Sequence, residues 1–242
     1  MDKKMSLSNH LNELRYRIIV AIAAVLAGAV IVFFKMKDIY VLLTAPLGGG
    51  VLHFIGPADG FITLVEIALV GGVILGWPVL LYQVLAFILP GTQTRERKII
   101  LACLVPGVIL FTVGVFFGNQ VIFPLILKFF LNAGEDYLSP MLIGSKYFSF
   151  LLLLTFAMGV VFEIPLVLFL LGHLGFINSN KLRATRMYGY VGILLVVGFF
   201  IPTPDIFTLL SVSAPVLVLY ESSIWILYLA EKLQHKEDTQ YA

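Results

Sequence analysis

Long uncharged apolar stretches, separated by short charged or proline- and glycine-rich segments, dominate this chain of 242 residues. A clear example runs from Ile18 to Phe34 without a charge. A helix needs about 20 mainly apolar residues to cross the roughly 30 Å hydrocarbon core of a bilayer. The chain has room for six such helices, and 60% of its residues are hydrophobic while only 12% are charged. This composition excludes a water-soluble globule and predicts an all-α integral membrane protein.

The apolar runs predict six membrane-spanning helices in one curved bundle. They cover about residues 18–34, 61–89, 99–117 with an extension past 124, 147–171, 187–201 and 206–220. Residues 35–60 are expected to form a long loop, since they contain Pro46 and several glycines. The fifth run of 15 residues reaches only about 22 Å. The hairpin of the last two helices is therefore expected to stop short of one membrane surface or to thin the bilayer.

The basic residues predict the orientation, because cytoplasmic loops of membrane proteins carry an excess of Lys and Arg. Four fall on the side opposite the N-terminus: Lys35, Lys37, Lys128 and Lys146. The other twelve are Lys3, Lys4, Arg15, Arg17, Arg95, Arg97, Lys98, Lys181, Arg183, Arg186, Lys232 and Lys236. Both termini are thus expected in the cytoplasm. The chain is predicted to be a single membrane domain (1–242), with a cytoplasmic amphipathic segment (1–17), a bundle (18–230) and a cytoplasmic tail (231–242).

Three acids interrupt the apolar runs: Glu66, Glu163 and Glu221. An ionised side chain in the middle of a bilayer costs at least about 2.5–3.5 kcal/mol, so each must face other helices or water. Glu163 is the most deeply placed, and Pro165 frees a backbone carbonyl close to it. A functional polar site is the default interpretation of Glu163. A structural acid, hydrogen-bonded within the bundle, remains the alternative, and for Glu66 and Glu221 it carries equal weight.

The N-terminal segment has the pattern of an amphipathic helix on the membrane surface. Its apolar stripe is formed by Leu7, Leu11, Leu14 and Ile18. Glu13 and Arg17 lie four residues apart on the polar side. By spacing alone this is an ordinary surface ion pair that contributes about 0.3–0.5 kcal/mol.

Several function classes find no support in the sequence. A net charge of +2 gives no basic face for nucleic acid, and a single cysteine, Cys103, excludes an intramolecular disulfide or a Cys/His metal cluster. Motifs of serine hydrolases, zinc proteases and nucleotide-binding loops are absent. The chain is therefore not expected to be an enzyme or to hold a metal or cofactor. A proton-coupled small-solute transporter, with Glu163 and Glu66 as relay carboxylates, remains the alternative, although no inverted halves or broken helices are evident.

Short stretches distributed in order along nearly the whole chain resemble the TatC family, the C subunit of the twin-arginine protein translocase. They are His-Leu-Asn-Glu-Leu-Arg-Tyr-Arg (10–17), Ala-Pro-Leu (45–47), Pro-Val-Leu-Leu-Tyr-Gln (78–83), Phe-Ile-Leu-Pro (87–90), Arg-Glu-Arg (95–97), Phe-Glu-Ile-Pro (162–165), Pro-Asp-Ile-Phe (204–207) and Tyr-Glu (220–221). The resemblance implies a six-helix receptor of the bacterial or archaeal cytoplasmic (inner) membrane. Such a receptor binds Arg-Arg signal peptides of folded cargo. It self-associates in a larger complex with single-span TatA- and TatB-type subunits, and the proton gradient supplies the energy for export.

The resemblance also implies roles for individual residues. Glu13 and Glu96 accept the two guanidinium groups of the signal peptide, because a carboxylate matches the planar fork of arginine. Arg15 and Arg17 position these acids or bind lipid phosphates. The resemblance also implies that three polar residues within the membrane act in transport: Gln83, Glu163 and Glu221. Glu163 is expected on a concave, partly wet face. Turn-forming positions are Pro46, Pro204 and Asp205.

Three positions depart from the family pattern. Glu66 stands where a Lys is common, Leu209 where a Gln is common, and Ile143 where an acid is common. The first departure leaves the role of this position in the second apolar run open. The other two departures weaken the expectation that the chain has the family's usual cluster for docking partner subunits and its outer-loop site. Thr203 and Thr208 could substitute locally for the missing polar groups.

Overall fold

The computed structural model describes residues 7–89, 94–132, 141–200 and 205–240, with side chains defined for 11–89, 97–132, 141–195, 197–198 and 205–232. Over these residues the chain is helical and has no strand, as predicted; one isolated β-bridge joins His53 to Ile143. The described elements are α1 (Leu7–Phe34), α2 (Met36–Thr44), η1 (Ala45–Leu47), α3 (Asp59–Ile88), α4 (Thr94–Ala102), α5 (Leu104–Phe117), η3 (Gly118–Ile122), α6 (Phe123–Asn132), α7 (Gly144–Val161), α8 (Ile164–His173), α9 (Ser179–Ala184), α10 (Arg186–Phe200) and α11 (Ile206–Gln240).

Five helices in the described part of the chain are long and apolar enough to cross a membrane. They cover Leu11–Phe34, Asp59–Ile88, Arg97–Asn132, Gly144–His173 and Ile206–Lys232. The predicted fifth run corresponds to α10, which has 15 residues and is shorter than these five. Helices suit the interior of a bilayer because each satisfies its own backbone hydrogen bonds.

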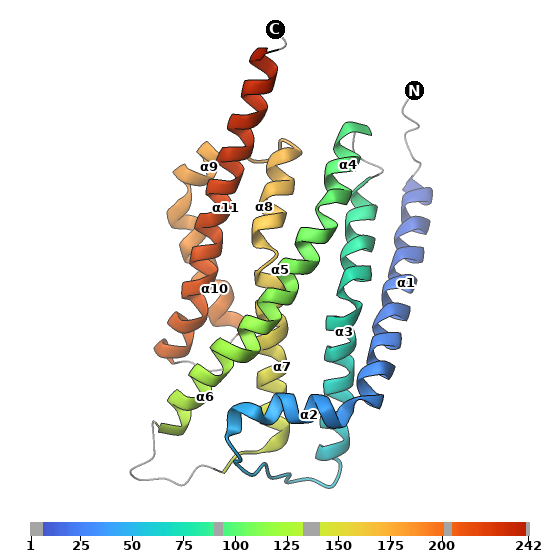
Figure 1. The fold of residues 1–242 in the computed structure, drawn as a ribbon, viewed down its shortest axis with the longest axis vertical. Helices are drawn as coiled ribbons and strands as arrows, with labels where there is room; N and C mark the ends of the chain where they lie inside the picture. The colour runs from blue at the N-terminus through green and yellow to red at the C-terminus, as the bar shows by residue number, and fades with distance from the viewer. Residues whose placement is uncertain (1–6, 90–93, 133–140, 201–204, 241–242) are drawn as a thin grey trace.

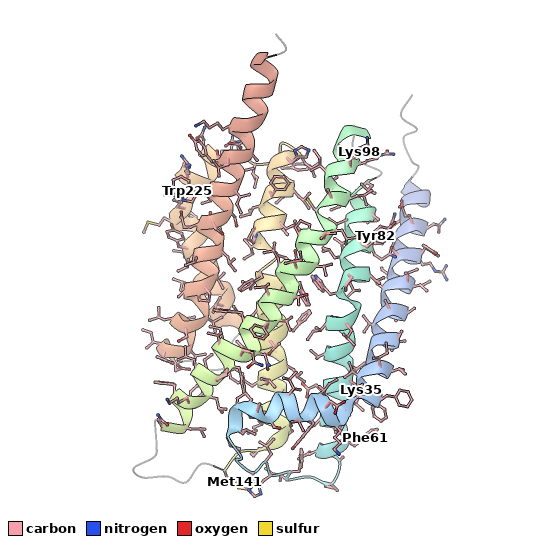
Figure 2. All side chains as sticks on the ribbon, viewed as in Figure 1. Lys35, Phe61, Tyr82, Lys98, Met141 and Trp225 are labelled. Atoms are coloured by element: carbon pink, nitrogen blue, oxygen red, sulfur yellow. The ribbon has the colours of Figure 1, made fainter. Side chains whose placement is uncertain are left out.

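The long helices run along one axis, with α1 and α3 at one edge and α9, α10 and α11 at the other (Figure 1). Helix α5 crosses obliquely between α4 and α6. The start of α1, the end of α11, α4 and α9 all lie at one end of the molecule, here termed the α4 end. Lys98 lies at this end, whereas Lys35, Phe61 and Met141 lie at the opposite end, here termed the α2 end (Figure 2).

Small residues bring α1 and α3 into close contact. A Cβ atom added at Gly72 of α3 would lie 2.6 Å from the backbone nitrogen of Ala29 and from the backbone oxygen of Val25 on α1. Only a glycine fits this crossing, and small residues one turn apart are typical of packed membrane helices. Because the lipid is as apolar as the side chains, such close backbone packing, rather than the hydrophobic effect, holds the two helices together.

The fourth apolar run is broken near its centre. Helix α7 ends at Val161 and α8 begins at Ile164, so Glu163 lies in the break. Pro165 has no N–H and cannot donate to the carbonyl of Val161 four residues earlier. The prediction of one continuous helix over this run, with no broken helix, is therefore wrong in this detail.

Two other predictions of local structure are corrected. The loop expected from residue 35 contains helix α2, which lies across the α2 end of the molecule (Figure 1), because the helix-breaking residues begin only at Pro46. The expected surface helix near the N-terminus is instead the first part of the single helix α1, since no Gly or Pro interrupts residues 7–27. Leu11 and Leu14 are accordingly exposed near the start of α1.

The last two helices, α10 and α11, form a hairpin. Helix α10 packs on α11, and the α2-end terminus of α11 lies above the level of α2 in Figure 1. Helix α10 is short, as expected, with 15 residues. The prediction of a short sixth helix is wrong, because α11 has 35 residues and continues beyond Tyr220, where the uncharged run ends. The effect of the hairpin on bilayer thickness remains a prediction.

Candidate functional site

An ion pair lies near the start of α1. The Arg17 Nε donates to Glu13 Oε1 at 3.1 Å, and Arg17 Nη2 donates to the same oxygen. The two side chains are 18% and 21% exposed, and Glu13 Oε2 is buried without a hydrogen-bond partner. The i,i+4 contact expected from spacing is therefore present, and a guanidinium already occupies the carboxylate.

A residue of another helix joins this pair. Arg17 Nη1 donates to Gln83 Oε1 of α3 at 3.3 Å. The role of Gln83 in transport within the membrane stays a prediction, and in the structure its side chain contacts the ion pair of α1. We refer to Glu13, Arg17 and Gln83 as the α1 cluster.

The other two residues predicted at this end are not joined to the α1 cluster by any described contact. Arg15 is exposed. Glu96 lies in α4 at the same end of the molecule as the start of α1 (Figure 1), and its side chain lies outside the described ones. The expected pairing of Glu13 with Glu96 therefore stays a prediction.

Glu163 forms the second site, in the interior. Its side chain is 6% exposed, so the expected position on a wet concave face is not what the structure shows. Oε1 accepts a hydrogen bond from Trp77 Nε1 of α3 at 3.0 Å, and Oε2 is buried without a partner. A Cβ atom on Gly107 of α5 would lie 3.3 Å from Oε2. Glu163 thus connects the α7–α8 break to α3 and faces α5.

Aromatic rings hold the donor of this hydrogen bond in place. The Trp77 ring stacks on Phe111 of α5, with centroids 3.9 Å apart and an interplanar angle of 10°. Phe156 of α7 meets both rings edge-on. Burial without a full set of donors is costly for a carboxyl group, so the surrounding helices must hold it there. Trp77 is a functional candidate that sequence reasoning missed, because its partner is 86 residues away.

Glu66 has a partner on α7. Ser149 Oγ donates to Glu66 Oε2 at 2.8 Å. A hydrogen bond therefore joins α3 to α7 through Glu66, and a second one joins α3 to the α7–α8 break through Trp77. This contact gives Glu66 a structural role at the position that departs from the family pattern.

Glu221 is tied to α10. It accepts a hydrogen bond from the Tyr190 hydroxyl and forms an ion pair with Arg186, with 3.1 Å between Arg186 Nη2 and Glu221 Oε2. The contacts span the α10–α11 hairpin. The structural interpretation of Glu221 in the sequence analysis is consistent with this position.

The predicted turn residues fall at helix ends. Pro46 lies in η1, and Asp205 Oδ1 accepts a hydrogen bond of 2.6 Å from the backbone N–H of Thr208, as an N-cap does. Pro204 lies outside the described residues. Of the two other departures from the family pattern, Leu209 packs against the main core and Ile143 forms the β-bridge with His53.

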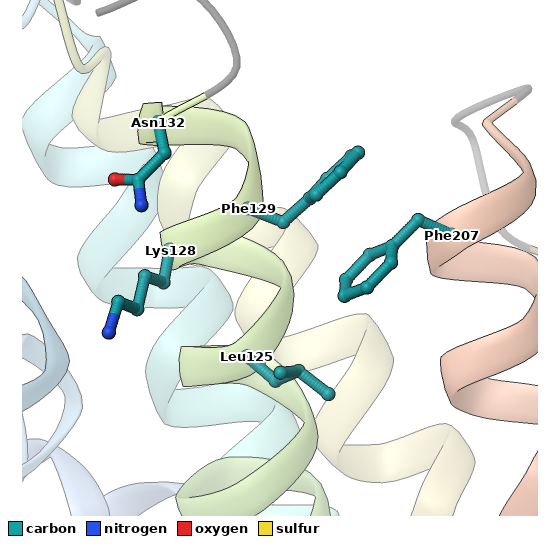
Figure 3. Close-up of a pocket in the computed structure, with 5 residues that line it drawn as sticks. All are labelled: Leu125, Lys128, Phe129, Asn132 and Phe207. Atoms are coloured by element: carbon teal, nitrogen blue, oxygen red, sulfur yellow. The ribbon is translucent and has the colours of Figure 1, made fainter.

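An open apolar groove lies between α6 and α11 near the α2 end (Figure 3). It has a volume of about 340 Å³ and is lined by Leu125, Lys128, Phe129, Asn132 and Phe207. The rings of Phe129 and Phe207 stack with centroids 4.1 Å apart. Among the described residues, no group of three or more His, Cys, Asp or Glu side chains is placed to hold a metal ion.

These features define a helical multi-pass membrane protein with a guanidinium-paired carboxylate at one end and a buried carboxylate at a helix break. The family profile described as "Sec-independent protein translocase protein (TatC)" matches residues 9–215. The chain belongs to the TatC family of protein translocase components.

Individual relatives support the assignment. The chain is 35% identical to the Sec-independent protein translocase protein TatC of Carboxydothermus hydrogenoformans over 227 residues, which cover 93% of each chain. It is 34% identical to the chloroplastic TATC of Oryza sativa subsp. japonica over 94% of this chain, and spans 64% of that longer protein. The crystal structure of the twin-arginine translocase receptor TatC matches with a TM-score of 0.80 and 34% identity, covering 92% of this chain and 99% of that one.

Proposed function

We propose that this protein is the receptor subunit of a twin-arginine translocase, which binds Arg-Arg signal peptides of folded cargo at the α4 end of the bundle. The observation that carries the proposal is the α1 cluster, in which Glu13 holds the guanidinium of Arg17. A ligand arginine offers the same planar fork and can exchange with Arg17. Glu96 of α4 supplies the second carboxylate, which accounts for a preference for two arginines.

The α4 end is proposed to face the cytoplasm of a bacterial or archaeal cell, with six spans and both termini on that side. Helix α10 is the fifth span along the chain and is shorter than the other five. The proposal is supported by the twelve basic residues predicted on that side and by the position of α4, α9 and both chain ends at one end of the molecule (Figure 1).

Glu163 is proposed to act in transport after the peptide has bound. Its carboxyl group lies in the α7–α8 break and accepts a hydrogen bond from Trp77 of α3. Breaking this hydrogen bond would therefore allow α3 to move relative to α7 and α8. Single-span partners of the TatA and TatB type are proposed to dock near α10 and α11, and the proton gradient is proposed to supply the energy. The break at Glu163 is a feature shared with small-solute transporters, but the family match over residues 9–215 favours the translocase function.

A binding assay tests the receptor function. The full chain is reconstituted in lipid nanodiscs and titrated with a twin-arginine signal peptide and its twin-lysine counterpart. The unsubstituted protein is expected to prefer the arginine peptide. Glu13→Ala and Glu96→Ala are each expected to weaken its binding by at least about tenfold, the equivalent of one charge-assisted hydrogen bond.

Asp38→Asn serves as the matched control, because Asp38 is an exposed acid of α2 at the opposite end. It is expected to leave binding within about twofold, as surface charges far from a site do. Unchanged binding by the Glu13→Ala, Glu96→Ala double variant, or equal affinity of the unsubstituted protein for both peptides, would refute the receptor function.

A further inference from the structure

Arg183 of the short helix α9 lies over two aromatic rings of α11. Its guanidinium carbon is 4.2 Å from the ring centroid of Tyr228 and 5.3 Å from that of Trp225. Arg183 Nε is buried and has no hydrogen-bond partner. Among the residues with described side chains, none forms an ion pair with Arg183. The cation is therefore positioned by cation–π contacts while its charge lacks an anionic partner.

The acids of α11 with described side chains have other partners. Glu231 accepts hydrogen bonds from the backbone N–H of Ser179, at 2.9 Å, and from the Ser179 hydroxyl. Glu221 is bonded to α10, as described above. Neither forms an ion pair with Arg183, so among the described side chains this guanidinium has no anionic partner.

The geometry of this contact favours an oxyanion as the missing partner. Aromatic rings engage the flat face of a guanidinium and leave N–H donors at its edge. Two such donors match two oxygens of a phosphate, which a point charge such as an ammonium does less well. The stacked arginine is thus already oriented for a phosphate group.

The corner also lies where phospholipid headgroups are expected. The apolar part of α11 ends at Ala230, before Glu231 and Lys232, so Trp225 and Tyr228 lie in its last two turns. Trp225 is 55% exposed and lies on the outer side of α11 toward the α4 end (Figure 2). Tyr188 of α10 is exposed as well. Exposed Trp and Tyr residues near the end of a span mark the membrane interface.

We propose that Arg183, lying over the rings of Tyr228 and Trp225, binds the phosphate group of an anionic phospholipid at the corner between α9 and α11. The acyl chains lie along the exposed apolar side chains of α11, among them Ile226 and Leu229. The lipid phosphate is the anionic partner of Arg183, and the lipid connects α9 to the last turns of α11. The site does not depend on peptide recognition by the α1 cluster.

Lipid titration of the delipidated full chain in dodecyl maltoside tests the proposal. Bound lipid is counted by native mass spectrometry, and the melting temperature Tm is followed in parallel. Phosphatidylglycerol is expected to bind and raise Tm, whereas phosphatidylcholine, whose phosphate is neutralised by its own choline, is expected to do so much less. Arg183→Gln is expected to weaken phosphatidylglycerol binding by at least about tenfold, the effect of losing charge-assisted hydrogen bonds.

Lys181→Gln is the matched control, because it removes an exposed charge from the same helix. It is expected to weaken binding by less than about threefold, as an exposed unpaired charge does. Equal losses in Arg183→Gln and Lys181→Gln would overturn the proposal in favour of general surface attraction. The same rise in Tm with inorganic phosphate alone would overturn the assignment to a lipid.

A second variant keeps the test decisive if Arg183→Gln does not fold. Arg183→Lys retains the charge and loses the planar fork, and is expected to weaken phosphatidylglycerol binding by at least about threefold. Undiminished binding by Arg183→Lys together with equal affinity of the unsubstituted protein for both lipids would contradict the proposal.

Discussion

Glu13 and Glu163 have the same bonding pattern in two different settings. Each carboxyl group has one oxygen in a hydrogen bond and the other buried without a partner. Glu13 receives a cation from its own helix four residues away and is 21% exposed. Glu163 receives a neutral indole N–H from another helix and is 6% exposed.

In the proposed function, this difference separates peptide recognition by Glu13 from conformational coupling by Glu163. The bond between Glu13 and Arg17 can open and be replaced by a ligand arginine while the helices stay in place, because both partners belong to α1. The bond between Trp77 and Glu163 cannot open without exposing a buried donor and acceptor or moving α3 against the α7–α8 break. The α1 cluster is therefore suited to binding, and the Glu163 site to a step that moves helices.

The largest expected effect follows from removing the interior carboxyl group. Glu163→Ala is expected to reduce export of a twin-arginine cargo by at least about tenfold, which corresponds to the loss of one hydrogen bond to a charged group. Signal-peptide binding is expected to stay within about twofold, since the α1 cluster is untouched. Export in cells that carry this protein as their only TatC, with crosslinking of the peptide, measures both. Normal export by Glu163→Ala would remove the functional role of this acid.

A smaller effect is expected from Trp77→Phe. Phenylalanine keeps an aromatic ring against Phe111 but provides no N–H for Glu163, so the buried carboxyl group loses its donor. The free energy of unfolding is expected to fall by about 1–3 kcal/mol. Thermal unfolding in detergent measures this as a decrease in Tm of several degrees, and Tyr82→Phe, at an exposed position of the same helix, is the control. Equal Tm values for the two variants would show that the indole hydrogen bond contributes nothing to stability.

The smallest effect is expected in the α1 cluster itself. Gln83→Leu removes the acceptor of Arg17 Nη1 but leaves the ion pair with Glu13. Peptide affinity is expected to change by less than about threefold, because a partly exposed, long hydrogen bond contributes less than about 1 kcal/mol. Peptide titration in nanodiscs tests this. A loss as large as that of Glu13→Ala would place Gln83 among the recognition residues.

The sequence indicates the helical class and the importance of Glu163 because both are one-dimensional properties. The length of the apolar runs predicts the spans. Glu163 is conspicuous in the sequence alone, because the sixteen residues before it, 147–162, are uncharged. The same pattern does not reveal Trp77, since an apolar run contains many aromatic residues and only the crossing of α3 with α7 and α8 selects one. Helix α2 was not predicted, because its nine residues are too few to show a clear helical periodicity of apolar side chains beside a turn-rich segment.

Other assignments changed when segments distant in the sequence were brought together. Gln83 belongs with Glu13 and Arg17 because α3 lies beside α1, where Gly72 permits close contact. Arg183 is one of several cations in a charged loop in the sequence. In the structure it lies on Tyr228, 45 positions later, while the described acids of α11 are bound elsewhere.

The sequence by itself determined that this protein is made of membrane-crossing helices, which residues interrupt them with charge, and which family the chain resembles. The tertiary structure alone decided which polar side chains meet: Arg17 with Gln83, Trp77 with Glu163, and Arg183 with Tyr228. The physical reason is that apolar length and charge are properties of a segment. A hydrogen bond or cation–π contact depends instead on the register of two helices, which close backbone packing sets to within a few tenths of an ångström.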